Sequence, residues 1–237
     1  MWYYSWQLLS DLFKRLPLRI WRFFNYLFDG LKRLSFKRSS LSAIPWWWLG
    51  LGLMLLEVLG IVELYEWMAG IFKTRTRALS PQERLLAESI FREAIDYTRV
   101  RIDERARLGP KQYRFCYVSF HTINSWGQMR DDVFIHELVH VWQYQYLGAA
   151  YISKALMAQW GAGYDYGGLT VLKKVKEEGG SLSDFNFEQQ ADIIMDYYRL
   201  SIGLRTRWGK ATAKDIIYYQ YYLDQLRSSQ FKTILGS

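Results

Sequence analysis

Apolar residues concentrate in one long run near the start of the chain, at residues 44–65. A helix from Trp48 to Tyr65 rises about 26 Å, close to the thickness of the hydrocarbon core of a bilayer. Aromatic residues, which favour the two membrane interfaces, stand at both edges of the run: Trp46, Trp47 and Trp48, then Tyr65 and Trp67. We therefore expect a transmembrane helix with its interface over residues 44–72.

Glu57 is the one acidic residue in the middle of this run. A carboxylate near the centre of a bilayer costs about 2.5–3.5 kcal/mol, and such residues usually have a packing partner or a function. One acidic residue does not outweigh the length and composition of the run. The span is therefore favoured over the alternative, a buried hairpin in a soluble domain.

Residues 1–43 mix apolar and basic positions in a way that is typical of amphipathic helices on a membrane surface. They hold eight Lys or Arg against two Asp, which is eight minus two, or +6 of the net charge of +8. This basic segment lies beside the predicted span, where anionic lipid is the natural partner and nucleic acid is not. The positive-inside rule then predicts a cytoplasmic N-terminus and an exported domain at residues 73–237.

The rest of the chain alternates helical patterns with short connections. Ser80, Pro81 and Glu83 form a helix start signal, and we expect a charged amphipathic helix from there to residue 108. One or two strands are expected within residues 112–124. Further helices are expected at residues 131–146, 149–160 and 169–178, around Glu188, and at residues 214–227. The predicted fold class is mainly α with a small β element, an α+β domain. It must be stabilised by its core, because the single cysteine, Cys116, excludes an intrachain disulfide.

The helix predicted at residues 131–146 carries a candidate metal motif, H-E-x-x-H, at His136, Glu137 and His140. A spacing of four places both imidazoles on one helix face, where they can share a zinc ion (Zn2+). Glu137 then lies beside the metal, where it can act as a general base for the attacking water. Only three histidines occur in the chain, and two of them are in this motif. The alternative is a buried helix with no metal.

Two histidines leave a catalytic zinc site short of a third protein ligand. Glu188 is the favoured candidate, since it begins a helix on which acidic residues recur at helical spacing. Asp192 or Asp196 on that helix could orient a ligand histidine. His121, at the end of a predicted strand, is the rival ligand.

A hydrolase of this kind also needs a donor that stabilises the oxyanion. The candidates are His121, Tyr197, Tyr198 and Tyr164, and the sequence does not select among them. Tyr164 belongs to the glycine-rich residues 161–168, which predict either an aromatic flap over the site or a plain connector.

The two motif blocks, FIHELVHVWQYQ at 134–145 and FNFEQQADIIMDYY at 185–198, resemble zincin-like proteins associated with type VI secretion. Together with the predicted membrane anchor, they are most similar to the TagX-type peptidoglycan hydrolases. The resemblance implies a zinc-dependent L,D-endopeptidase of the bacterial inner membrane, with a single-pass anchor and a periplasmic catalytic domain. It also implies His136, His140 and Glu188 as ligands, Glu137 as the base, and peptidoglycan and type VI secretion components as partners.

Two other functions fit the same residues. A membrane-anchored protease acting on protein substrates would use an identical metal site. A non-catalytic scaffold of the secretion apparatus would hold zinc structurally, with a fourth protein ligand in place of an open position. A toxic effector is closer to the favoured function than these two, but a retained membrane anchor is more typical of an enzyme that stays in its own cell.

Overall fold

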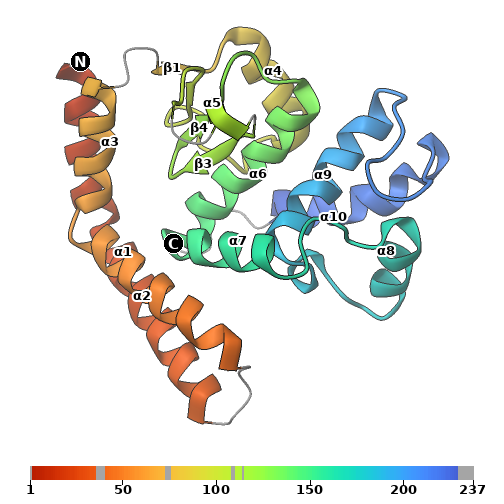
Figure 1. Cartoon of the computed structure of the whole chain (residues 1–237), viewed down its shortest axis with the longest axis horizontal. Coiled ribbons are helices and arrows are strands. Elements are labelled where there is room, and N and C mark those ends of the chain that lie inside the picture. Colours follow the sequence, from red (N-terminus) through yellow and green to blue (C-terminus); the bar gives the residue numbers. More distant parts are fainter. Residues whose placement is uncertain (1, 36–40, 73–75, 108–109, 114, 229–237) are drawn as a thin grey trace.

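The chain folds into a helical domain with a small sheet and an extended N-terminal arm, formed by α1, α2 and α3 (Figure 1). The computed structural model describes residues 2–35, 41–72, 76–107, 110–113 and 115–228. The helices are α1 Trp2–Ser35, α2 Ile44–Val58, α3 Ile61–Phe72, α4 Pro81–Phe91, α5 Pro110–Tyr113, α6 Asp131–Leu147, α7 Ala150–Trp160, α8 Gly168–Glu177, α9 Phe187–Ser201 and α10 Ile216–Ser228. The strands are β1 Thr76–Ala78, β2 Arg101–Asp103, β3 Tyr117–Ser119 and β4 Thr122–Asn124.

The four strands form one mixed sheet in the order β1-β2-β4-β3. β2 and β4 are parallel, whereas β1 pairs antiparallel with β2 and β3 pairs antiparallel with β4. Because helices make up most of the described chain, the α+β prediction is confirmed. β3 is an edge strand, and α6 passes beneath the sheet beside it (Figure 1).

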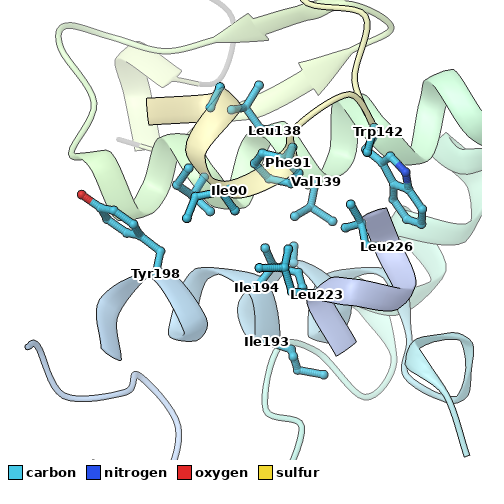
Figure 2. Close-up of a cluster of buried hydrophobic side chains, with 14 of the residues drawn as sticks. Ile90, Phe91, Leu138, Val139, Trp142, Ile193, Ile194, Tyr198, Leu223 and Leu226 are labelled. Carbon is cyan, nitrogen blue, oxygen red and sulfur yellow. The ribbon is translucent and has the colours of Figure 1, made fainter. Parts of the chain in front are cut away.

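The main hydrophobic core lies between α4, α6, α9 and α10 (Figure 2). Val139 of α6 faces Ile194 of α9 and Leu226 of α10, whereas Leu138 lies on the side of α6 nearer the sheet, and all four side chains are buried completely. Since α6 and α9 carry the predicted metal ligands, this packing fixes the distance and rotation between the two elements that would hold a metal.

The helix predicted from Ser80 to residue 108 is shorter than expected. Its start is as predicted: the Ser80 side chain accepts from the Glu83 amide and Glu83 accepts from the Ser80 amide. The helix ends at Phe91, however, and the chain turns at Arg92, whose φ is +52°. Residues 101–103 then form β2 at the centre of the sheet. At residues 101–103, strand pairing with β1 on one side and β4 on the other outweighs the helical charge pattern.

The apolar run at residues 44–72 is not one continuous helix. Among the described residues no single helix is both long and apolar enough to cross a membrane. α2 and the first part of α3 meet that standard only together, and they are bent by 77° at Leu59 and Gly60. Gly60 has a φ of +75°, which favours glycine and ends α2 at this point.

The N-terminal arm packs against the rest of the structure through buried polar contacts. Arg22 Nη2 donates to the carbonyl oxygen of Gln145 on α6 at 3.0 Å. Glu57 of α2 accepts from the amide of Ala149, just before α7, at 2.7 Å. These contacts join the N-terminal arm directly to α6 and to the start of α7.

Candidate metal centre

Helix α6 supplies the first two candidate ligands from a buried surface. Asp131 and Asp132 occupy its first turn, where acids complement the helix dipole, and Gly148 follows its last residue. The bounds agree with the predicted helix to within one residue. His136 and His140 lie one turn apart on the same face, with their Nε2 atoms 3.2 Å from each other.

Helix α9 brings the third candidate ligand to the same point. The Asn186 side chain accepts from the Gln189 amide, and Gln189 accepts from the Asn186 amide, so a reciprocal cap fixes the first turn. Glu188 lies in that turn and is completely buried. Its Oε2 atom is 3.3 Å from His136 Nε2 and 3.2 Å from His140 Nε2.

These three atoms have the spacing of ligands around one zinc ion. Zinc bonds of about 2.0–2.1 Å in a tetrahedral arrangement separate the ligand atoms by about 3.3 Å. The observed separations of 3.2, 3.2 and 3.3 Å match this value. Among the described residues, these three form the one group of at least three His, Cys, Asp or Glu ligand atoms that meets such a spacing.

The other nitrogen of each histidine has a fixed hydrogen-bond partner. His136 Nδ1 donates to Asp192 Oδ1 at 2.7 Å, and His140 Nδ1 donates to Gln143 Oε1 at 2.8 Å. The amide of Gln143 is oriented in turn, because its Nε2 donates to the Phe187 carbonyl oxygen and to Gln190 Oε1. Both histidines are thereby held in the tautomer whose Nε2 lone pair is free for a metal.

Glu188 is held ionised and oriented. Burial alone would raise the pKa of this carboxyl, but the two neighbouring histidines hold the pKa well below its ordinary value. Its second oxygen, Oε1, accepts from Gln159 Nε2 of α7 at 2.6 Å. One oxygen thus stays directed at the histidine pair while the other is anchored to a third helix.

Glu137 lies next to the three candidate ligands but is not one of them. Its side chain is buried, and burial raises the pKa of its carboxyl. Its Oε2 atom has no hydrogen-bond partner among the described residues. A carboxylate with a raised pKa and a free oxygen, at the edge of a cavity, can take up a proton from a bound molecule.

The candidate centre opens into a cavity of about 580 Å³, within the usual size of a ligand site. Side chains of α6, α7 and α9 form part of its wall, and β3 with the residues before it forms another. The edge strand thus borders the cavity directly. Described lining residues include Phe115, Tyr117, Val118, Tyr151, Leu156 and Tyr164.

The structure separates the alternatives that the sequence left open. Asp192, rather than Asp196, contacts a candidate ligand histidine. His121 is paired with Glu66 of α3 at 3.0 Å and lies outside the cavity, so it is not placed as a ligand or a donor there. Asp196 instead accepts from the Tyr166 hydroxyl and from the Arg207 amide.

Of the predicted oxyanion donors, only Tyr164 lines the cavity. Its ring lies 6.0 Å from that of His136. The Tyr198 hydroxyl donates to Asp131 at the far end of α6, and Tyr197 packs against the core. Residues 161–168 therefore do contribute a side chain to the site.

Sequence reasoning missed Gln143, Gln159 and Trp208. Trp208 Nε1 donates to the second oxygen of Asp192 and so fixes the carboxylate that orients His136. Gln143 has a signal in the sequence, since it is a polar residue one turn after His140 on a helix that is otherwise mostly apolar. Gln159 and Trp208 have none, because their roles depend on how α7 and the segment after α9 fold back.

Comparison with known proteins gives one relationship of limited extent. The chain is 32% identical over 139 residues to the type VI secretion system spike protein VgrG2b of Pseudomonas aeruginosa. The alignment covers 52% of this chain and 13% of the spike protein, so the chain matches about an eighth of that relative. No family model matches the sequence, and no solved structure matches it.

Proposed function

We propose that this protein is a zinc-dependent peptidase that hydrolyses stem peptides or cross-links of peptidoglycan. The observation that carries the proposal is the group of three ligand atoms at tetrahedral spacing, with Glu137 beside them on the wall of a cavity. His136, His140 and Glu188 would hold the metal. When bound, zinc supplies a Lewis acid that activates water and polarises a peptide carbonyl.

The protein's own residues provide the proton transfers and the orientation. Glu137 accepts a proton from the attacking water and passes it to the leaving amine, which its raised pKa favours. Asp192 and Gln143 hold the two imidazoles in the ligating tautomer. Tyr164 is the described hydroxyl from residues 161–168 that is available to stabilise the oxyanion.

The substrate class and the setting are part of the proposal. The similarity to a type VI secretion spike protein supports an association with that secretion system. The resemblance of the two motif blocks to TagX-type hydrolases supports an L,D-endopeptidase that acts in the periplasm. Such an enzyme would open the cell wall locally so that the secretion apparatus can be assembled.

The test compares the purified full-length chain with Glu137→Ala and with a matched control, Glu177→Ala, which changes an exposed glutamate on α8. Zinc content is measured by mass spectrometry, and each protein is then incubated with isolated peptidoglycan. We expect zinc in all three proteins and an about 10²–10⁴-fold loss of muropeptide release in Glu137→Ala alone.

Two outcomes would replace this proposal with an alternative. Zinc-dependent cleavage of a protein substrate but not of peptidoglycan would favour the general protease. Normal zinc content with no hydrolysis of either substrate, and normal secretion in cells that carry Glu137→Ala, would favour the scaffold.

A further inference from the structure

The N-terminal arm carries most of the exposed apolar side chains of the described chain. Of 26 large hydrophobic residues that are exposed, 16 lie between residues 13 and 68, which is less than a quarter of the sequence. Exposed apolar side chains gathered on one part of a protein mark an interaction site. The 16 residues are Phe13, Ile20, Trp21, Phe24, Phe28, Leu31, Trp48, Leu49, Leu55, Leu56, Leu59, Ile61, Leu64, Tyr65, Trp67 and Met68.

On α1 these residues form a stripe opposite the domain. Phe13, Trp21, Phe24 and Phe28 follow one another at helical spacing and are 48–72% exposed. The opposite face holds Arg19 and Arg22, both of which are buried. Since the polar side of α1 faces the protein, the apolar side is left for a different environment.

Polar contacts on that inner face explain why an acidic residue, Glu57, stands in the apolar run. Arg19 donates to the Glu57 carbonyl oxygen at 3.1 Å and to Glu63 Oε2 at 3.0 Å. The Glu57 carboxylate pairs with Arg19 Nε through Oε1 at 3.8 Å and accepts from the amide of Ala149 through Oε2 at 2.7 Å. The acid that makes a spanning helix costly is therefore used to fasten α2 to the domain.

The geometry of α2 and α3 also argues against a span. Helices of 15 and 12 residues rise about 22 and 18 Å, short of a hydrocarbon core of about 30 Å. Their 77° bend prevents them from adding these lengths along one axis. In addition, Gly50 and Met54 of α2 are buried, so one face of this helix is covered by protein.

We propose that the arm is a monotopic membrane anchor: it lies in one interface of an anionic bilayer, with the N-terminus and the catalytic domain on the same side. The exposed basic residues of α1 select anionic lipid headgroups. Lys14 and Lys32 are exposed on α1 among the apolar residues, where they can reach those headgroups.

The proposed membrane face continues onto the domain at α7. The rings of Trp46 and Trp160 contact each other at 5.1 Å, and Trp160 is 78% exposed. The neighbouring Gln159 lines the metal cavity and holds Glu188. One helix therefore contacts both the arm and the candidate metal centre, which places the site close to the bilayer surface.

Vesicle flotation tests whether the exposed apolar face of the arm binds a membrane. The full-length chain is mixed with vesicles of phosphatidylglycerol and phosphatidylcholine in equal parts, or of phosphatidylcholine alone. We expect flotation with the anionic vesicles and an about ten-fold weaker partition for the double variant Trp21→Glu, Phe24→Glu. The matched control Ile202→Glu, Leu204→Glu, at the end of α9, should float like the wild type.

Zinc content and size-exclusion chromatography are measured on the same variants. Normal zinc content shows that a variant is folded. If the double variant Trp21→Glu, Phe24→Glu loses zinc, the single variant Phe13→Glu is tested in its place. Equal flotation of wild type and arm variant would overturn the proposal. So would a dimer that the arm variant converts to monomers without any change in flotation, since the face would then bind a second copy.

Cysteine labelling tests the topology. In a Cys116→Ser background, Lys14→Cys and Glu177→Cys report on the arm and the domain, and both native side chains are exposed. Spheroplasts expressing each variant are treated with a membrane-impermeant maleimide before and after lysis. A monotopic arm requires the two positions to label under the same condition. Labelling of one position before lysis and of the other only after lysis would show a span and overturn the proposal.

Discussion

Replacing Asp192 by asparagine should weaken zinc binding by reversing the tautomer of His136. One oxygen of Asp192 accepts from Trp208 Nε1, which is a donor only. The oxygen of an asparagine must therefore face Trp208, and its NH₂ group must face His136 Nδ1. That nitrogen then becomes the acceptor, and the proton moves to Nε2, the atom that would bind the metal.

The structure also sets the size of the effect. To bind zinc, His136 in the variant must keep its proton on Nδ1. The asparagine side chain must then turn its oxygen to His136 and its NH₂ group to Trp208 Nε1, which is also a donor, so one hydrogen bond is lost. An unsatisfied buried polar group costs about 1–3 kcal/mol. We therefore expect zinc affinity to fall by about 10–100-fold, the usual range for residues that orient a ligand histidine.

Competition with a chromophoric chelator measures this affinity. Asp196→Asn is the matched control, because Asp196 is equally buried and lies one turn further along α9 but does not contact a histidine. The control should bind zinc within about twofold of the wild type. If Asp192→Asn does so as well, the tautomer reasoning is refuted and the hydrogen bond to His136 has no role in metal binding.

Three further predictions concern stability. Burial raises the pKa of Asp196 from 3.8 to about 6, so the native state binds this proton more tightly than the unfolded chain; the contribution of this group to the free energy of unfolding, about 3 kcal/mol, should be fully present below about pH 4 and be lost as the pH rises to about 6. Asp196→Asn should remove that slope in urea titrations across this range, and an unchanged slope would assign it to another group. Leu223→Ala, at a completely buried position between α9 and α10, should cost about 2–5 kcal/mol by the same method. Ser80→Ala should cost about 1 kcal/mol through loss of the cap on α4, whereas Ser183→Ala, at an exposed position, should leave stability unchanged.

The sequence predicted those parts of the site that depend on local geometry. The spacing of His136 and His140 on one helix determines their common face, and the cap at Asn186 determines where Glu188 lies in its helix. The choice between Asp192 and Asp196 could not be made in the same way. Both lie at helical spacing from Glu188, and only the rotation of α9 against α6 brings the first to His136.

Two features of the fold that the sequence did not indicate have a common physical cause. A run of apolar residues has the same local signal whether lipid or protein surrounds it, so the bend at Gly60 and the partners of Glu57 were not predictable from residues 44–72 alone. Similarly, the charged residues after Phe91 have a helical pattern, but their partners in the sheet lie about twenty positions further along the chain. In both places, contacts distant in sequence decide the structure.

The contact between Glu57 and Ala149 bears on where the folded domain begins. A fragment that starts after α3 would lose the carboxylate that accepts from the amide at the start of α7, and also Arg22, which binds the Gln145 carbonyl oxygen. His121 would lose its partner Glu66. Truncation at the apparent end of the apolar segment would therefore remove part of the domain's own framework.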